Sequence, residues 1–283
     1  MNPSGNRLLI TGGSGYLGRE LIRQARGRWP LTATYLTQPI DGDPAIDWRR
    51  LDVRDGPAVA ALVDALQPAA IIHTAALKQG AEADLEAINA DGSRHVARAA
   101  AAIDAHLIHV STDVIFDGRE GPYTEQAPPN PITAYGHSKA HAERAVRGSR
   151  VRGAIVRTSL IYGWEPMGRN TRWIIEALRA GESVRLFTDE LRCPIWVRSL
   201  AAALLELMEI GHAGVLNVAG AQVLSRYDFG LRLLRFHGID PAPVIPALSR
   251  ESGLHRPLDC TLDSSRARAL LATPLPGVDE VLV

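Results

Sequence analysis

The sequence has no excess of charge and very little cysteine. Its 283 residues include 31 lysines and arginines and 31 aspartates and glutamates, so the formal net charge is zero. Proteins that bind nucleic acid or membrane surfaces usually carry a basic excess, and we expect neither partner. The two cysteines, Cys193 and Cys260, belong to no CxxC or Cys/His pattern. This predicts reduced thiols, no metal site and a cytoplasmic location.

Long hydrophobic runs are also missing. No stretch reaches the about 18–20 apolar residues that a membrane-spanning helix needs. The opening "MNPSGNRLLITGG" has no positive region followed by a long apolar core, so we expect no signal peptide. Hydrophobic residues nevertheless make up 46% of the chain, which is enough for a sizeable core and argues against disorder.

The first half of the chain alternates short apolar runs with longer helical patterns. Strands that alternate with helices predict an α/β fold, with a doubly wound parallel sheet of the Rossmann type and helices on both faces. The predicted strands are residues 7–11, 31–37, 48–53, 69–77, 106–112 and 153–163, and the predicted helices are 16–26, 56–67 and 82–102.

The second half is less regular. Its patterns predict helices over 170–180, 197–210 and 225–237 and a strand over 214–220. We therefore predict a main domain over residues 1–162 and a smaller C-terminal lobe over 163–283, which is interleaved with the last strands of the sheet.

A glycine-rich turn follows the first strand. In "LLITGGSGYLGRE", Gly12, Gly15 and Gly18 fit a GxxGxxG spacing, and Gly13, Gly15 and Gly18 fit GxGxxG. Such glycines permit a tight turn and let the backbone approach a pyrophosphate, while the helix N-terminus offers N–H groups to the phosphates. The alternative is a turn without a ligand. Because the motif follows the first strand of a βαβ unit, it favours the reading with a ligand and predicts a dinucleotide-binding domain that spans residues 1–162.

The residues at the end of the second predicted strand indicate whether the dinucleotide is NAD(H) or NADP(H). Sites for NAD usually carry an acidic residue there, but Thr37 and Gln38 occupy the tip, and the first carboxylate is Asp41. The sequence therefore favours NADP(H) over NAD(H), although no arginine is evident at the tip and the nearest candidate is Arg19.

The third predicted strand ends at Asp52 and Val53. Asp52 is predicted to accept a hydrogen bond from the adenine amino group, with Val53 against the ring. The alternative is that Asp52 caps the helix that follows.

Three polar residues suggest the chemistry. Thr112 ends a predicted strand, and Tyr135 and Lys139 follow at a spacing that puts both on one helix face. A free tyrosine has a pKa of about 10, and an adjacent ammonium favours the phenolate. Tyr135 is thus predicted to protonate a ketone oxygen after hydride transfer, with Lys139 as its tuner and Thr112 holding the substrate oxygen. Ser111 is either a second hydroxyl of the site or a strand-end residue.

At this point the sequence resembles the extended short-chain dehydrogenase/reductases, and within them the dTDP-4-dehydrorhamnose reductase branch. The similarity rests on TGxxGxxG, Asp52, Asn89, the Tyr-x-x-x-Lys pair and several branch segments. These segments are "HTAAL" (73–77), "STDVIFDG" (111–118), "RTSLIYG" (157–163), "CPIWVRSLAAAL" (193–204) and "RPLDCTLDSSRARALL" (256–271).

The resemblance implies a reductase that acts on a keto group of a nucleotide sugar or a related small ketone. It is compatible with a homodimer. It implies a catalytic triad of Thr112, Tyr135 and Lys139, and substrate contacts from Asp113, Arg192 and Arg256. The implied cofactor-binding residues are Gly12, Ser14, Gly15, Tyr16, Leu17, Gly18, Thr37, Asp52, Val53, Ala75, Ala76, Tyr135 and Lys139.

Some positions depart from the family pattern. His73 replaces the usual asparagine, and Val114 follows Thr112-Asp113 where the dehydratases of the superfamily carry glutamate. The missing glutamate argues against the activity of a nucleotide-sugar 4,6-dehydratase. Two alternatives stay open: a non-catalytic subunit like the regulatory subunit of methionine adenosyltransferase, and a nucleotide-sugar 4-epimerase.

Other aromatic and basic residues have two readings each. Trp164, Trp173 and Trp196 either stack on a base or sugar or pack in the protein interior. Arg192 and Arg256 either hold a diphosphate or lie on the surface. His137 and His141 are interpreted as surface residues, because no third metal ligand is evident.

Overall fold

The computed structural model describes residues 7–38 and 44–283. Its main feature is a seven-stranded sheet in the order β11-β6-β5-β4-β1-β2-β3. The five strands from β3 to β5 in this order pair in parallel, as the strand–helix alternation predicts. The strands are β1 (Leu8–Thr11), β2 (Leu31–Tyr35), β3 (Ile46–Arg50), β4 (Ala70–His73), β5 (His106–Thr112), β6 (Gly153–Thr158) and β11 (Gly214–Asn217).

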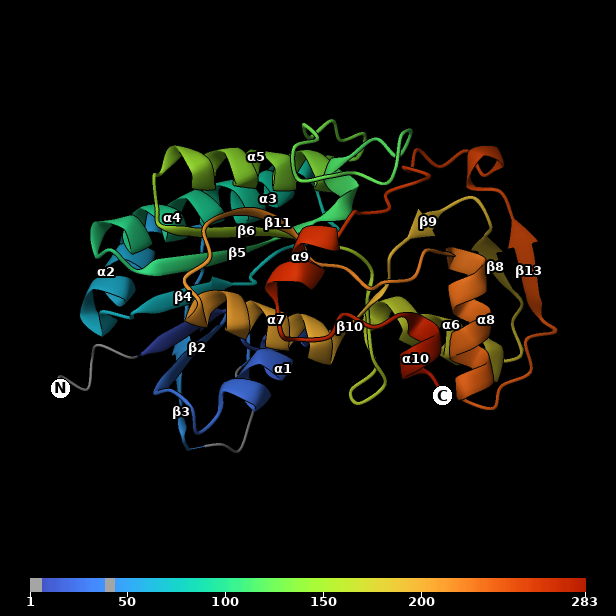
Figure 1. Ribbon diagram of the computed structural model, residues 1–283, viewed down its shortest axis with the longest axis horizontal. Helices are drawn as coiled ribbons and strands as arrows, with labels where there is room; N and C mark the ends of the chain where they lie inside the picture. The colour runs from blue at the N-terminus through green and yellow to red at the C-terminus, as the bar shows by residue number, and fades with distance from the viewer. Residues whose placement is uncertain (1–6, 39–43) are drawn as a thin grey trace. The chain divides into compact units, whose positions relative to one another are not determined.

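Helices cover both faces of this sheet (Figure 1). On one face lie α2 (Gly56–Leu66), α4 (Gly92–Ala102) and α5 (Ala134–Gly148), and on the other lie α1 (Tyr16–Ala25) and α7 (Val197–Glu209). Central strands such as β1 are buried along their whole length, because helices on both faces leave no side for polar residues. The predicted doubly wound α/β fold is confirmed.

The direction in which the chain adds strands reverses between β1 and β4. From β1 the chain adds β2 and β3 on one side, and then returns to add β4 and β5 on the other. In open α/β sheets, ligands bind beyond the carboxyl ends of the strands at such a switch point. The glycine turn after β1 and the "HTAAL" loop after β4 both lie at this place in the topology.

The long helix predicted over 82–102 is interrupted. It consists of α3 (Glu82–Leu85), a π-helical segment η2 (Glu86–Asp91), and α4. Such widened turns are uncommon and often occur at functional sites. Asn89 lies in η2, and its side chain leaves the helix to bind the loop after β4.

Contacts divide the chain into two units that alternate along the sequence. The first comprises Met1–Ser111, Ala134–Val156 and Ala201–Val215, and the second comprises Thr112–Thr133, Arg157–Leu200 and Leu216–Val283. The domain boundary after residue 162 stays a prediction. Among the described residues, no helix combines the length and the apolar character needed to cross a membrane.

The second unit contains short strand pairs and its own apolar cluster. Ile174, Leu186, Leu233 and Val244 are among the buried side chains of that cluster. The sequence patterns do not predict the short strands, because two-residue strands carry no measurable period. The elements are η3 (Asp113–Ile115), β7 (Ile161–Tyr162), α6 (Arg169–Arg179), β8 (Val184–Phe187), β9 (Leu191–Arg192), β10 (Ile195–Trp196), β12 (Leu224–Ser225), α8 (Arg226–Phe236), β13 (Val244–Ala247), η4 (Ser249–Glu251), α9 (Ser265–Leu270) and α10 (Val278–Val281).

Candidate active site

The glycine turn after β1 is built as the spacing predicts. Gly12 has φ +70°, and a Cβ there would lie 2.7 Å from the backbone of Ala75. The amide of Gly15 donates to the carbonyl of Gly12 at 2.9 Å. A Cβ on Gly18 would clash with the Gly12 carbonyl oxygen. At Gly12 and Gly18 only glycine fits, because the turn, helix α1 and the loop after β4 approach one another so closely.

Helix α1 begins at this turn without a side-chain cap. Gly15 is its N-cap residue and has no side chain that could accept from the first-turn amides. These N–H groups and the positive end of the helix dipole suit a phosphate. Tyr16 is half-buried and Leu17 is buried. The Ser14 carbonyl accepts a hydrogen bond from Arg19 Nε at 3.0 Å. The turn therefore fits a dinucleotide pyrophosphate.

The tip of β2 differs from the sequence-based expectation in one respect. Thr37 and Gln38 follow the end of β2 and are exposed, while Asp41 lies outside the described residues. However, β3 pairs Arg50 with Tyr35, and Arg50 Nε donates to the Leu36 carbonyl at 3.2 Å. The expectation that no arginine lies at the tip is therefore wrong. The arginine comes from the neighbouring strand.

Asp52 follows the end of β3 and pairs with Arg54. The Asp52 carboxylate accepts from the backbone N–H of Arg54 at 3.0 Å and from its Nη2 at 2.6 Å. The hydrogen bond from the Arg54 guanidinium, the largest cause, lowers the pKa of Asp52. Asp52 does not cap α2, because Asp55 holds that position and accepts from the Ala58 amide. Asp52 is thus half-buried, charged and not used as a cap.

The neighbouring predicted adenine contacts differ in their exposure. Val53 is buried in the core of the first unit. Its side chain fills the space where a Cβ on Gly92 would lie. After β4, Ala75 is half-buried and Ala76 is exposed. The adenine contacts of Asp52 and Val53 stay predictions.

Lys139 is buried on α5, four residues after Tyr135. Its Nζ donates to the Val110 carbonyl on β5 at 2.7 Å. Burial lowers the pKa of Lys139 to about 8, and the negative charge of Glu143 partly opposes this. Tyr135 is half-buried in the first turn of the same helix. Residues at this spacing share a helix face, so the predicted acid and its tuner lie side by side on α5.

Ser111 acts as a strand-end residue. It is buried, and its hydroxyl donates to Glu143 Oε1 at 2.7 Å. Glu143 is itself almost fully buried and lies one turn after Lys139 on α5. Of the two readings of Ser111, the structure supports the one in which it ties the end of β5 to this helix.

Thr112 and Asp113 belong to the second unit. The Thr112 hydroxyl donates to Asp113 Oδ1 at 3.1 Å and accepts from the Val114 amide. Asp113 is buried, and its other carboxylate oxygen accepts from the Ser159 hydroxyl at 2.7 Å. Arg192 Nε lies 3.6 Å from the same oxygen. Asp113 therefore holds the Thr112 hydroxyl from a fixed position.

Arg192 is only 8% exposed and is not a surface residue. Its guanidinium donates to the carbonyls of Leu191, Leu258 and Pro257 at 2.7–3.0 Å. These bonds use the planar fork that could otherwise bind a phosphate group, so Arg192 mainly joins β9 to the segment that contains Pro257.

Arg256 and Arg226 are the other basic residues of this region. Arg256 is exposed, and its Nη1 lies 3.2 Å from Glu190 Oε1. Arg226 begins α8, where burial first and the charge of Arg192 second lower its pKa to about 10. Sequence reasoning missed Arg226. The Arg226 amide donates to the Glu190 carbonyl, which places the start of α8 beside Glu190. This tertiary contact brings Arg226 close to Arg192 and Arg256, and no pattern in the sequence predicts it.

The contacts of the tryptophans and of His141 bear on the two readings given to these residues from the sequence. Trp164 stacks on Trp196 at 5.6 Å between ring centroids and also contacts Phe236, which supports packing. Trp173 is 42% exposed. His141 Nδ1 lies 2.6 Å from Glu86 Oε1. Within residues 7–38 and 44–283, no cluster of three or more histidine, cysteine, aspartate or glutamate side chains is arranged to hold a metal ion.

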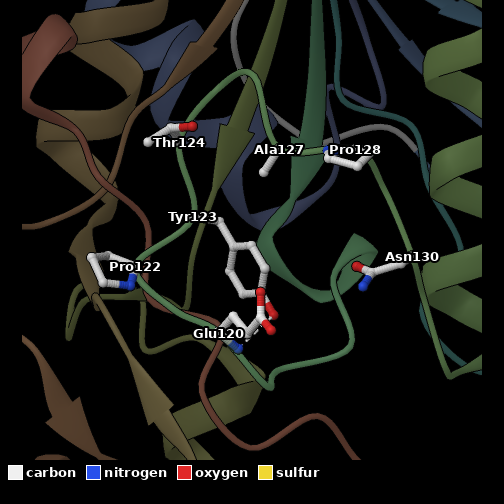
Figure 2. Close-up of a pocket in the computed structure, with 7 residues that line it drawn as sticks. All are labelled: Glu120, Pro122, Tyr123, Thr124, Ala127, Pro128 and Asn130. Carbon is white, nitrogen blue, oxygen red and sulfur yellow. Dashed lines mark hydrogen bonds between the residues drawn. The ribbon is translucent and has the colours of Figure 1, made fainter.

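A cavity of about 260 Å³ lies in the second unit, along the segment between Asp113 and Tyr135. Figure 2 shows the residues that line it, with the Tyr123 ring in the middle of the view; the others are Glu120, Pro122, Thr124, Ala127, Pro128 and Asn130. The Tyr123 hydroxyl donates to Asp117 and accepts from the amides of Arg119 and Glu120. This arrangement fixes the loop, and none of the predicted site residues lines the cavity.

The doubly wound sheet, the glycine turn at its switch point and the Tyr-x-x-x-Lys pair on α5 together define an oxidoreductase of the extended short-chain dehydrogenase/reductase type. A family profile described as "RmlD substrate binding domain" matches residues 6–282. The chain belongs to this family, and the resemblance to dTDP-4-dehydrorhamnose reductases drawn from the sequence is confirmed.

Individual relatives agree with this assignment. A Streptomyces griseus protein named dTDP-4-dehydrorhamnose reductase is 35% identical over 289 residues, which are 95% of this chain and 89% of that protein. A crystal structure described as a hypothetical dTDP-4-dehydrorhamnose reductase from Sulfolobus tokodaii has a TM-score of 0.86 at 33% identity and covers 96% of this chain and 98% of its own.

Two further relatives concern the cofactor and the alternatives. The crystal structure of dTDP-4-dehydrorhamnose reductase from Bacillus anthracis in complex with NADP has a TM-score of 0.82 at 26% identity and covers 98% of this chain and 97% of its own. The methionine adenosyltransferase 2 subunit beta of Xenopus tropicalis is 27% identical over 277 residues, which are 93% of this chain and 81% of that protein.

Proposed function

We propose that this protein is an NADP(H)-dependent reductase of the 4-keto group of a deoxy-sugar nucleotide such as dTDP-4-dehydrorhamnose. The observation that carries the proposal is the buried Lys139, held by the Val110 carbonyl in the same helix that presents Tyr135. Relatives that are 30% identical or more and carry a reductase name support the choice of substrate.

In this proposal Tyr135 is the proton donor. Bound NADPH supplies the hydride, which is added to the carbonyl carbon. The Tyr135 hydroxyl gives its proton to the carbonyl oxygen, so that the ketone becomes an alcohol and the tyrosine becomes a phenolate. The Lys139 ammonium stabilises the phenolate through its charge. A buried ammonium is effective here, because few water molecules screen it.

Thr112 and Asp113 form the second part of the proposed triad. The single proton of the Thr112 hydroxyl is directed at Asp113. To donate to a substrate oxygen, the Thr112 hydroxyl turns away from Asp113. The Asp113 carboxylate loses little by this, because Ser159 and Arg192 still hold its other oxygen. Asp113 thus holds the Thr112 hydroxyl until that hydroxyl turns to the substrate oxygen, and Tyr135 is the proton donor.

The preference for NADP(H) follows from the tip of β2. Thr37 and Gln38 bring no negative charge to this position, and the guanidinium of Arg50 lies beside the Leu36 carbonyl. Arg19 lies at the start of α1, where its Nε is held by the Ser14 carbonyl. Two arginines next to the ribose position suit a 2′-phosphate, which Arg binds through charge-assisted hydrogen bonds.

For the substrate, Arg256 is the best diphosphate ligand of the second unit. It is exposed, and among the described residues its guanidinium pairs with Glu190 and lies over the Phe187 ring, which leaves further N–H donors for a phosphate. Arg192 is the weaker candidate, since three carbonyls already use its donors. Arg226 adds a positive charge to the same region. The assignment of Asp113, Arg192 and Arg256 as direct substrate ligands is therefore narrowed to Arg256.

The test is turnover of purified protein with NADPH and dTDP-4-dehydrorhamnose, followed by nicotinamide absorbance. The proposal expects NADPH oxidation that requires the keto sugar, and a Tyr135→Phe variant that binds NADPH but is at least about a hundredfold slower, as for other lost general acids. An unchanged rate in Tyr135→Phe would remove the assigned role from this residue.

The same assay decides between the alternatives. A non-catalytic binding subunit would bind NADPH without turnover of any keto sugar, and a 4-epimerase would interconvert sugars without net NADPH oxidation. Neither alternative has better support than the reductase. A cytoplasmic location and a homodimer stay predictions, the first supported by two buried, free cysteines.

A further inference from the structure

His73 stands at the end of β4 where the family usually has asparagine, and it is 1% exposed. Its Nδ1 lies 2.6 Å from the Thr11 hydroxyl, at the end of β1 and directly before the glycine turn. Its Nε2 lies 3.1 Å from the Ser93 hydroxyl on α4. One imidazole therefore joins the strand that leads into the glycine turn to the helix that follows η2.

The contacts continue from Ser93 to the helix of Tyr135. The Ser93 hydroxyl donates to the Asn89 carbonyl at 2.5 Å. Asn89 Nδ2 donates to the Ser138 hydroxyl at 2.9 Å, and that hydroxyl donates to the Tyr135 carbonyl at 2.8 Å. His73, Ser93, Asn89 and Ser138 are all at most 1% exposed. The whole chain of contacts is buried, so removing one member leaves its partner with an unsatisfied polar group at a cost.

The loop after β4 is tied to both ends of this chain. The Thr74 hydroxyl donates to the Thr11 carbonyl at 2.7 Å. At the other end, Asn89 accepts from the Leu77 amide and donates to the Leu77 carbonyl, both at 2.8 Å. The loop thus cannot shift without affecting both Thr11 and Asn89.

The positions of the protons follow from the number of donors. Ser93 has one hydroxyl proton, and it is directed at Asn89. Ser93 must therefore accept from His73, which places a proton on Nε2. The bare Nδ1 then accepts from the Thr11 hydroxyl. Both ring nitrogens are satisfied by a neutral imidazole with a single defined tautomer.

The surroundings also oppose a second proton on His73. The charged neighbour is Lys139 on α5, and the neutral imidazole of His109 on β5 stacks beside His73 at 5.5 Å. Burial first, and the Lys139 charge second, lower the pKa of His73 to about 3. Thr11 and Ser93, which face the other edges of the ring, carry no charge.

We propose that His73, as the neutral Nε2–H tautomer, is a positioning residue that joins the glycine turn to the helix of Tyr135. It holds Thr11 on the cofactor side and, through Ser93, Asn89 and Ser138, the first turn of α5 on the proton-donor side. This role rests on the function proposed above, but its first test does not.

The first test is nitrogen NMR of the whole protein with labelled histidine. The His73 resonances are those that disappear in His73→Gln among the nine histidines. We expect protonated Nε2, unprotonated Nδ1 and no change between about pH 8 and about pH 5.5, a range in which an ordinary histidine titrates. A proton on Nδ1, or titration near the ordinary pKa, overturns the proposal.

The second test separates the two ends of the chain of contacts. Thr11→Val removes the donor on the cofactor side, and we expect about tenfold weaker NADPH binding with kcat at saturation within about twofold of the wild type. Ser93→Ala breaks the other side, and we expect kcat to fall about tenfold with unchanged NADPH affinity. If both variants lower only the melting temperature and leave affinity and kcat unchanged, His73 has a merely structural role and the proposal is wrong.

His109 provides a matched control for His73. Both are buried histidines of neighbouring parallel strands, but both ring nitrogens of His109 lack a hydrogen-bond partner among the described residues. We expect His73→Leu to lower NADPH affinity and kcat about tenfold each, and His109→Leu to change each by less than about twofold. Equal effects of the two replacements contradict the proposal. If the wild type turns over no keto sugar, the proposed function fails, while NMR and NADPH binding still decide the role of His73.

Discussion

The lowered pKa of Lys139 predicts how both the unfolding free energy and kcat depend on pH. The Lys139 side chain is 3% exposed and its pKa is about 8, against an ordinary value of 10.5, because burial disfavours the charged form. Between these two pH values the unfolded chain carries a proton that the folded protein has released. Unfolding free energy therefore rises with pH across this window. Below pH 8 both states are charged, and the full cost of burying the ammonium is present.

The size of this effect follows from the two pKa values. The difference between 10.5 and about 8 corresponds to about 3 kcal/mol, since each pH unit contributes about 1.4 kcal/mol. The perturbation is Lys139→Met, which keeps the length and the apolar stem of the side chain but removes the charge. The difference in unfolding free energy, wild type minus variant, should grow by up to about 3 kcal/mol from about pH 7.5 to about pH 10.5.

Urea unfolding at a series of pH values measures this difference, because each titration of urea gives the free energy in water. The kcat of the wild type should fall over the same range, because the ammonium that supports the Tyr135 phenolate is lost above a pKa of about 8. Parallel pH curves for wild type and Lys139→Met would refute the argument that burial controls this lysine.

The remaining predictions concern three other positions. Arg50→Ala should weaken NADPH binding relative to NADH by about tenfold or more, as expected for a lost charge-assisted hydrogen bond; the matched control Arg49→Ala, whose Nε is bound to Asp47 at 2.8 Å, should keep the preference. His109→Leu should leave the unfolding free energy within about 1 kcal/mol of the wild type at neutral pH, because it removes an unpaired buried polar ring. The pKa of His109 is held well below 6.5 by burial, so wild-type stability is lost as pH falls from about 6.5, and His109→Leu should flatten this loss in urea titrations. Asp55→Ala should destabilise the protein by about 1 kcal/mol in the same measurement, because it removes the cap of α2; an effect of this size in Asp52→Ala instead would contradict the assignment of the cap.

Local features of the fold were predictable from sequence because their signals are local. Gly12, Gly15 and Gly18 are needed by a turn of a few residues, and the spacing of Tyr135 and Lys139 is a property of one helix. Most strands of the sheet are short apolar runs, and their alternation with helices leaves few possible topologies. These signals sufficed for the fold class and for the proposed proton donor.

Features that depend on strand register could not be predicted. Arg50 reaches the tip of β2 only because β3 pairs it with Tyr35. The choice between Asp52 and Asp55 as the cap of α2 depends on where β3 ends, and strand ends are poorly marked in sequence. The structure gives the cap to Asp55, so the alternative reading of Asp52 as a helix cap is wrong, while its adenine contact stays a prediction.

The buried polar contacts were also beyond sequence reasoning. His73 finds its partners 62 residues before it and 20 residues after it, in Thr11 and Ser93. Arg192 donates to Pro257 and Leu258, 65 and 66 residues further on. A basic side chain in a polar stretch is usually exposed, and only the tertiary fold places carbonyl groups around this one.

The most direct test of the account is the rate of NADPH oxidation with dTDP-4-dehydrorhamnose, measured for the wild type and for Tyr135→Phe at equal NADPH occupancy. The account predicts turnover in the wild type that depends on the keto sugar, and a loss of at least about a hundredfold in kcat in the variant. Equal rates in the two proteins would contradict Tyr135 as the proton donor. No oxidation by a wild type that binds NADPH would contradict the reductase itself.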